Sequence, residues 1–355
     1  MRLRLLLIAP IYCVDIVNIY GYVDIVNKGR DMTTTLITGG HAGIGLACST
    51  NLATVPGMNP VLAGRSLERM EPVAQQLRTT HGITVKTLLL DVSSLTSVRS
   101  AVAELCAMLD DGDIPPLQAI LCNAGGQFRG PISYSADGYE ETFATNYLGH
   151  FLLSHLLLDR ISVQGRIVFT ASGTHDPDTA DGRMVGKAAE PDGFMLANNG
   201  KNGEKPLSAG VRYSTSKLCM MLYAYELHRR LRRSGSSVAS VAFDPGSIPE
   251  TGLLRTMPKP VQWLAKTSAM KWVMRRMGVT QGSVGFSGGA LARIATDPEF
   301  SDSSGKYLQS NDGNLIEARS SVASYDETKA ARLWQVSQDL VNLQPNERPT
   351  VLGQT

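Results

Sequence analysis

The stretch TTTLITGGHAGIG, residues 33–45, places a short apolar run directly before a glycine-rich loop and the start of a helix. Glycines at Gly39, Gly43 and Gly45 would let the backbone turn tightly and approach a pyrophosphate, which then rests on the helix N-terminus. A glycine-rich loop alone is a weak signal. Here the apolar run before it and the helical pattern after it supply the strand–loop–helix context that a dinucleotide site requires.

The same alternation of strand and helix continues along the chain. The expected strands are residues 33–40, 60–65, 84–92, 117–125, 165–172, 237–246 and 305–310, and the expected helices are residues 44–54, 67–80, 97–109, 139–161, 211–231 and 283–296. This order predicts an α/β fold, a Rossmann-type doubly wound parallel sheet in a single domain with helices on both faces. Ligands of such sheets bind outside the carboxyl ends of the strands.

The ends of the chain fall outside this pattern. Residues 1–31 begin with a basic, apolar run too short to span a bilayer, and VDIVN occurs twice in them. Because Met32 stands directly before the first strand, we interpret residues 1–31 as an N-terminal extension outside the fold. The domain is expected to cover residues 32–345, and residues 346–355 form a tail.

Two segments inside the domain interrupt the alternation. Residues 173–210 are rich in Gly, Pro, Asp and Asn, and are interpreted as a long active-site insert, with a disordered surface loop as the alternative. Residues 249–281 carry Trp263, Trp272 and several Met, interleaved with Lys and Arg. We interpret them as a lid over an apolar substrate, and peripheral contact with a membrane surface stays open.

Composition excludes several classes of partner and site. The formal net charge is +2 with scattered charges, which gives no footprint for nucleic acid. The five cysteines are odd in number, lie in apolar contexts and show no paired metal-binding spacing. We therefore expect reduced thiols, no metal site and a cytoplasmic location.

Tyr213 and Lys217 lie four residues apart in the expected helix 211–231, so they share one face of it. An ammonium beside a tyrosine favours the phenolate, which suits acid/base catalysis. This spacing is common by chance, so other residues must support the interpretation.

That support comes from a resemblance to the short-chain dehydrogenase/reductase superfamily over residues 33 to about 345. The matching features, in chain order, are TGGHAGIG (38–45), Asp91-Val92, CNAG (122–125), NYLGHF (146–151), GRIVFTAS (165–172), YSTSK (213–217) and Pro245-Gly246. They resemble the superfamily's TGxxxGxG loop, adenine-contacting pair, NNAG, helix motif, catalytic serine strand, YxxxK and PG.

The resemblance implies a role for each catalytic candidate. Tyr213 is the acid/base at the substrate oxygen, and Lys217 lowers its pKa and holds the nicotinamide ribose. Ser172 hydrogen-bonds the substrate oxygen, while Asn146 fixes a water that connects Lys217 to solvent. Donors of this kind suit the negative charge that hydride transfer builds on a carbonyl oxygen. The structural alternatives are a turn hydroxyl, a helix-bending amide and a core tyrosine.

The cofactor implied by the resemblance is NADP(H). The expected cofactor-binding residues are Gly39, His41, Gly43, Ile44, Gly45, Arg65, Asp91, Val92, Asn123, Ala124, Gly125, Tyr213, Lys217, Pro245 and Gly246. The second strand ends in Arg65 without an acidic residue, and an Arg there accommodates a 2′-phosphate. His41 and Arg69 could contribute, or could be ordinary surface residues.

The long span from Ser172 to Tyr213 and the tail at 326–343 resemble the branch that contains retinol dehydrogenases and light-dependent protochlorophyllide reductases. Ser247 stands where the light-driven enzymes carry a cysteine, and a hydroxyl is far less acidic than a thiol. We therefore expect carbonyl–alcohol interconversion on a sizeable apolar substrate, steroid-, retinoid- or polycyclic-like. The alternatives are a carbon–carbon double-bond reductase and a non-catalytic NADP(H)-binding regulator.

The oligomeric state is left open by the sequence. Many members of the superfamily pair through the helices that correspond to residues 139–161 and 213–233. The long insert can prevent or alter that pairing.

Overall fold

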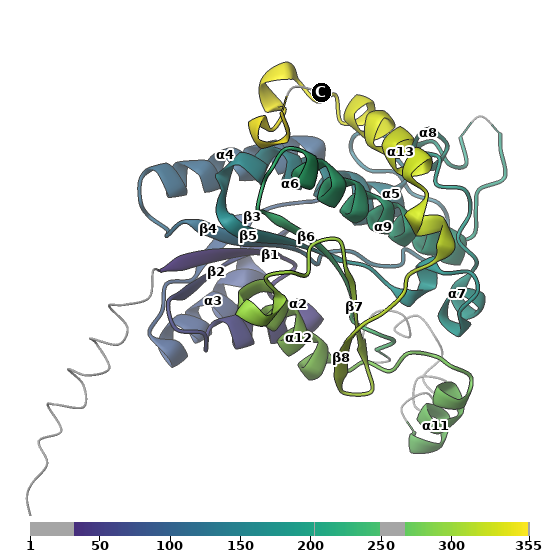
Figure 1. Cartoon of the computed structure of the whole chain (residues 1–355), viewed down its shortest axis with the longest axis horizontal. Coiled ribbons are helices and arrows are strands. Elements are labelled where there is room, and N and C mark those ends of the chain that lie inside the picture. Colours follow the sequence, from purple (N-terminus) through teal and green to yellow (C-terminus); the bar gives the residue numbers. More distant parts are fainter. Residues whose placement is uncertain (1–31, 202, 249–266, 354–355) are drawn as a thin grey trace, which may run out of the picture.

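The computed structural model describes residues 32–201, 203–248 and 267–353 (Figure 1). The centre of the fold is an eight-stranded sheet in the order β3-β2-β1-β4-β5-β6-β7-β8. Strands β1 to β7 run parallel, and β8 is antiparallel to β7. The strands are β1 (Thr33–Thr38), β2 (Met58–Gly64), β3 (Lys86–Leu89), β4 (Leu117–Cys122), β5 (Ile161–Thr170), β6 (Ala239–Asp244), β7 (Tyr307–Asn311) and β8 (Asn314–Glu317).

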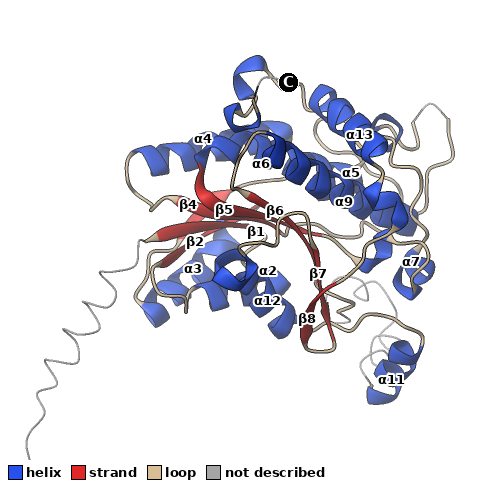
Figure 2. Ribbon diagram, viewed as in Figure 1, coloured by secondary structure: helices blue, strands red, loops and turns tan. Residues whose placement is uncertain are grey.

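Helices cover both faces of this sheet (Figure 2). One face carries α2 (Gly43–Leu52), α3 (Leu67–His81) and α12 (Val284–Thr296), and the other carries α4 (Leu95–Asp110), α6 (Gly149–Leu157) and α9 (Ala209–Arg233). The central strands are buried on both sides: Leu36 of β1 packs in one apolar core and Ile37 in the other. Continuous apolar strands are what a parallel sheet between two helical layers requires. The predicted α/β fold is therefore confirmed.

The helix predicted over residues 139–161 is wrong in its continuity and its end. It divides into α5 (Glu141–Phe143), a π-helical turn (Ala144–Leu148) and α6, followed by a 3-10 turn (Leu158–Arg160). Ile161 already belongs to β5. The apolar pattern carried the prediction too far, because Ile161, the first residue of the strand, is apolar and buried like Leu157 and Leu158 before it.

The insert at 173–210 is built of short capped helices in the part that the structure describes. Thr179 accepts a backbone hydrogen bond at the start of α7 (Ala180–Val185), and Asp192 does so at the start of α8 (Gly193–Ala197). Within the expected lid, residues 249–266 lie outside the described residues, as do residues 1–31. The remainder includes α11 (Ser268–Arg276).

The C-terminal helix α13 (Glu327–Leu340) lies on the outer side of α6 and α9 (Figure 1). Its Trp334 is buried, with its ring centre 5.7 Å from that of Phe151 and 5.4 Å from that of Tyr223. The guanidinium of Arg230 stacks on the same ring at 4.3 Å. An aromatic cluster thus fixes α13 to the two helices beneath it.

The packing continues past residue 345. Arg99 pairs with Glu347 at 2.6 Å, and Thr350 donates to Asp159 from both its backbone and its hydroxyl. In the part of the chain that the structure describes, no helix has the length and apolar character needed to cross a membrane.

Two adjacent glycines of α12 give a matched test of the contact between α12 and α2. A Cβ on Gly288 would lie 2.4 Å from the Cβ of Ala47, whereas a Cβ on Gly289 would meet nothing closer than Asn51 at 3.5 Å. We expect Gly288→Ala to lower the free energy of unfolding by about 1–3 kcal/mol through overpacking. Gly289→Ala should leave it unchanged or raise it by up to about 1 kcal/mol, through helix propensity. Urea unfolding measures both, and equal effects would contradict the close packing.

Candidate active site

The loop between β1 and α2 is shaped by its glycines. Gly39 and Gly43 have φ of +71° and +53°, a region that favours glycine. A Cβ on Gly45 would lie 2.2 Å from the carbonyl oxygen of Gly39, so the loop closes on itself only without one. No side chain caps α2, whose first turn therefore keeps backbone N–H donors for an anionic ligand.

The side chain of Thr38 joins this loop to the end of β4. Its hydroxyl oxygen accepts hydrogen bonds from the backbone N–H groups of Asn123 and Ala124, both at 2.9 Å. The Asn123 side chain returns a bond to the carbonyl of Thr38, also at 2.9 Å. Gly125 follows with φ +150°, where a Cβ would lie 2.6 Å from Oδ1 of Asn146. The predicted cofactor residues of β1 and β4 are thus brought together.

Asn146 lies in the π-helical turn between α5 and α6, a type of turn frequent at functional sites. Its amide donates to the carbonyl of Gly126 at 3.0 Å and to Oγ of Ser216 at 2.9 Å. It also accepts from the Gly126 N–H at 2.9 Å. Ser216 in turn donates to the carbonyl of Tyr213 at 2.7 Å. Asn146 is therefore fastened both to the loop after β4 and to the helix that carries Tyr213.

Ser172, Tyr213 and Lys217 meet at the carboxyl end of β5. Ser172 follows the strand and accepts a bond from the Thr174 hydroxyl at 3.1 Å. Lys217 is buried, donates to the carbonyl of Thr170 at 2.7 Å and places Nζ 5.7 Å from the centre of the Tyr213 ring. The Ser172 side chain lies close enough to Tyr213 to lower the pKa of its phenol.

Burial sets the protonation of this group. It raises the pKa of Tyr213 to about 12, and the Ser172 side chain opposes that rise. It lowers the pKa of Lys217 to about 8, against the attraction of Asp244. Near neutral pH the tyrosine is therefore a neutral phenol with a proton to donate, beside a lysine whose charge is easily changed.

Sequence reasoning missed Asp244, a buried carboxylate at the end of β6. It accepts hydrogen bonds from the Tyr307 hydroxyl and from Nε2 of Gln309, both at 2.8 Å. Its charge acts on both Lys217 and Tyr213. The available signal was its place directly before Pro245-Gly246 at a strand end, where the site was already expected.

The remaining predicted cofactor residues line the same edge of the sheet. Pro245 accepts a bond from Ser287 at 2.7 Å, and Gly246 turns with φ +74°. Asp91 accepts from the backbone and hydroxyl of Ser93, at 3.0 and 2.8 Å. Val92 is buried beneath α6 and Ile44 is half-buried in the first turn of α2.

Three basic side chains gather near the end of β2. Arg65 follows the strand and is exposed, and Arg69 is exposed in the first turn of α3. His41 lies against Gly64, and both partial burial and the charge of Arg69 lower its pKa. Within the described residues, no group of three or more His, Cys, Asp and Glu could hold a metal ion.

Comparison with known proteins identifies the family of this chain. The sequence model of the family described as short chain dehydrogenase matches residues 33–180. Short-chain dehydrogenase TIC 32 A, a chloroplastic protein of Brassica napus, is 30% identical over 320 residues, which cover 88% of this chain and 89% of the relative. The chain belongs to the short-chain dehydrogenase family. It therefore falls among oxidoreductases.

Another relative is the chloroplastic protochlorophyllide reductase of Daucus carota. It is 31% identical over 334 residues, covering 87% of this chain and 78% of that protein. Among solved structures, the NADPH-dependent 3-quinuclidinone reductase of Rhodotorula rubra shares the fold with a TM-score of 0.54 and 22% identity, covering 80% of this chain and 91% of that one. A blue fluorescent protein from a metagenomic library, solved with NADPH, has a TM-score of 0.56 and 20% identity, with coverage of 80% and 98%.

A second buried carboxylate, Asp181 of α7, gives a pH-dependent test of the insert. It accepts from the backbone N–H and hydroxyl of Thr280 at 3.1 and 3.3 Å, and burial raises its pKa from 3.8 to about 6. Folding thus favours the protonated acid. Its contribution to stability is fully present below about pH 3.8 and is lost as the pH rises through about 6.

We therefore expect Asp181→Asn, which cannot ionise, to gain stability relative to the parent protein as the pH rises from 4 to 7. The gain should be roughly 2–3 kcal/mol, followed by urea unfolding at each pH. The exposed neighbour Asp178, changed to Asn, serves as the control and should show no such trend. Parallel stability curves for Asp181→Asn and the parent would contradict the burial of this carboxylate.

Proposed function

We propose that this family member is an NADP(H)-dependent oxidoreductase that interconverts a carbonyl and an alcohol on a sizeable apolar substrate, with Tyr213 as the acid/base. The observation that carries the proposal is the meeting of Ser172, Tyr213 and Lys217 at the end of β5, on the edge of the sheet that holds the glycine loop. The resemblance assigns these same residues to catalysis.

The residues at this edge fit a dinucleotide. The absence of a Cβ at Gly45 lets the loop close on the carbonyl of Gly39, and the uncapped start of α2 suits a pyrophosphate. Arg65, Arg69 and His41 would face the 2′-phosphate of NADP(H). Two proteins that share the fold are described with NADPH, which supports the same choice.

Bound there, NADPH would supply the hydride. The side chains of this protein would stabilise the negative charge on the substrate oxygen and donate a proton to it. As negative charge grows on the carbonyl oxygen, the hydroxyls of Ser172 and Tyr213 donate hydrogen bonds to it. Tyr213 gives its proton to that oxygen, and the Lys217 ammonium stabilises the phenolate left behind. The preference for an apolar substrate is drawn from the composition of residues 249–281.

The proposed role of Tyr213 predicts a selective loss in Tyr213→Phe, which keeps the ring and removes the donor. Turnover of a bulky carbonyl in the dark should fall by at least about 100-fold, because proton transfer from a positioned group contributes 10²–10⁴. NADPH binding, followed by the fluorescence of the bound nicotinamide, should change less than about threefold. A variant with unreduced turnover would exclude Tyr213 as the acid.

Arg65 is the residue whose change tests the cofactor. Arg65→Gln removes the charge from the end of β2, so the Kd for NADPH should rise about 10- to 100-fold, while the Kd for NADH stays unchanged. Arg332→Gln, on an arginine whose side chain is 74% exposed in α13, is the control. Equal binding of NADH and NADPH by the parent protein would overturn the assignment of NADP(H).

A second candidate is reduction of a carbon–carbon double bond, because several relatives are named protochlorophyllide reductases. Turnover of protochlorophyllide that requires light would establish it, whereas dark turnover of ketones or aldehydes supports the main proposal. These relatives are also named as chloroplastic, so a plastid location stands beside the cytoplasmic one expected from the cysteines.

A further inference from the structure

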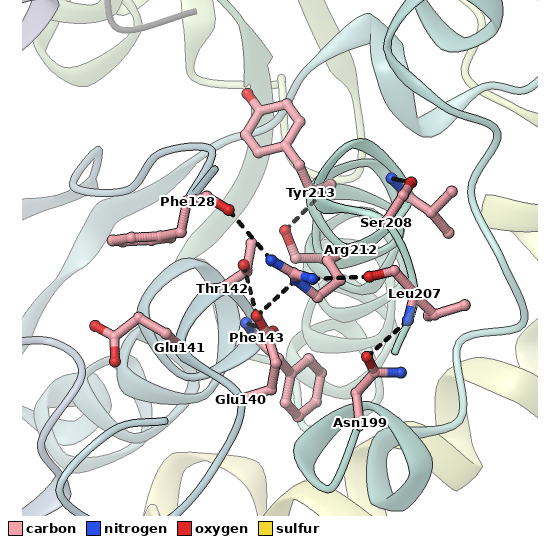
Figure 3. A network of polar contacts seen from close by, with 12 residues as sticks. Phe128, Glu140, Glu141, Thr142, Phe143, Asn199, Leu207, Ser208, Arg212 and Tyr213 are labelled. Atoms are coloured by element: carbon pink, nitrogen blue, oxygen red, sulfur yellow. Dashed lines mark hydrogen bonds and ion pairs between the residues drawn. The ribbon is translucent and has the colours of Figure 1, made fainter. Parts of the chain in front are cut away.

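Arg212, directly before Tyr213, forms a buried ion pair with Glu140 (Figure 3). Nε of Arg212 lies 3.0 Å from Oε1 of Glu140, and the two side chains are only 5% and 2% exposed. Among the ion pairs of residues 32–201, 203–248 and 267–353, both partners are this deeply buried only here.

The guanidinium of Arg212 also holds two loops that flank the site. Nη1 donates to the carbonyl of Leu207 at 2.7 Å, in the insert, and Nη2 donates to the carbonyl of Phe128 at 3.3 Å, in the segment after β4. In Figure 3 the guanidinium points toward Glu140 and these carbonyls, while the ring of Tyr213 points the other way. Arg212 therefore contacts the surroundings of the site and leaves the phenol free for substrate.

Glu140 organises the helix that leads to Asn146. Its carboxylate accepts the backbone N–H of Phe143 and the hydroxyl of Thr142, both at 2.8 Å, and so caps the start of α5. Helix α5 continues directly into the π-helical turn that carries Asn146. The ion pair thus connects the residue before Tyr213 to the beginning of the Asn146 segment.

A buried ion pair is weak evidence for stability, because desolvation of the two charges offsets most of their attraction. Its geometry, in contrast, is restrictive: a planar guanidinium that pairs with Glu140 and donates to two carbonyls tolerates little displacement. We infer that Arg212 and Glu140 are positioning residues that hold Tyr213 in register with Asn146 and the loop after β4. This inference rests on the proposed function of Tyr213.

The inference predicts a loss in kcat and not in binding. Arg212 and Glu140 touch neither the glycine loop nor the basic side chains at the end of β2, so NADPH affinity should be kept. A displacement of about 1 Å at a reacting group can cost 100-fold in rate. We expect kcat for a bulky ketone to fall about 10- to 100-fold, with KM and the Kd for NADPH within about threefold.

The decisive variant is the double change Arg212→Met with Glu140→Gln. Either single change leaves one buried charge without its partner and is expected to lower the free energy of unfolding strongly. The double variant removes both charges and should recover thermal stability close to that of the parent protein. Its kcat should stay at least tenfold low, because Met cannot bond the carbonyls of Phe128 and Leu207. Recovery of both stability and kcat would overturn the inference, since the pair would then be structural only.

A spectroscopic readout separates this inference from the proposed function. In protein labelled with ¹³Cζ-tyrosine, the Tyr213 resonance is assigned by its loss in Tyr213→Phe. The double variant should shift or broaden that resonance, while the exposed-pair control Arg332→Met leaves it unchanged. If the parent turns over no carbonyl, the proposed function fails, yet a shifted resonance still supports the positioning role. An unchanged resonance with unchanged kcat overturns it.

Discussion

The hydroxyl of Thr38 is the contact on which the site depends. It is buried at the end of β1, accepts two backbone N–H groups from the segment after β4 and lies 3.0 Å from Nε2 of His150 in α6. One oxygen therefore fixes the glycine loop, the Asn123–Gly125 segment and a helix of the covering layer to one another. Because parallel strands end at a common edge, β5 brings Ser172 and β6 brings Asp244 to the same edge, where Tyr213 and Lys217 of α9 also lie.

Burial then gives the corner its chemistry. Desolvation raises the pKa of the Tyr213 phenol and lowers the pKa of the Lys217 ammonium. The charge of Asp244 opposes the shift at Lys217. The proton thus resides on the group that the proposed reaction needs as a donor. The polar side chains that surround this group are themselves held by side chain–backbone bonds, so their dipoles need little rearrangement when charge develops.

Local chemistry allowed most of the strands and the glycine loop to be predicted from sequence, because an apolar run and a turn glycine act over a few residues. The parts that escaped prediction depend on distant partners. In the sequence Arg212 is an ordinary helical cation, and only the structure shows its ion pair with Glu140. Likewise, only the structure shows that the charge of Asp244 acts on Lys217. Asn146 lies in a π-helical turn and bonds Gly126 and Ser216, contacts between distant residues that helical periodicity does not encode. Strand β8 is short and largely exposed, so it lacks an apolar pattern.

The position of Trp334 has a consequence for quaternary structure. Many members of the superfamily that this chain resembles pair through the corresponding long helices, and in this structure α13 covers part of that surface. The rings of Phe151, His155 and Tyr223 pack against Trp334 of α13. The hydroxyl of Tyr147 forms a hydrogen bond at 2.8 Å with that of Ser337, which also lies in α13. A second copy could reach these rings only after α13 had been displaced. The C-terminal helix of the chain itself therefore covers this aromatic surface.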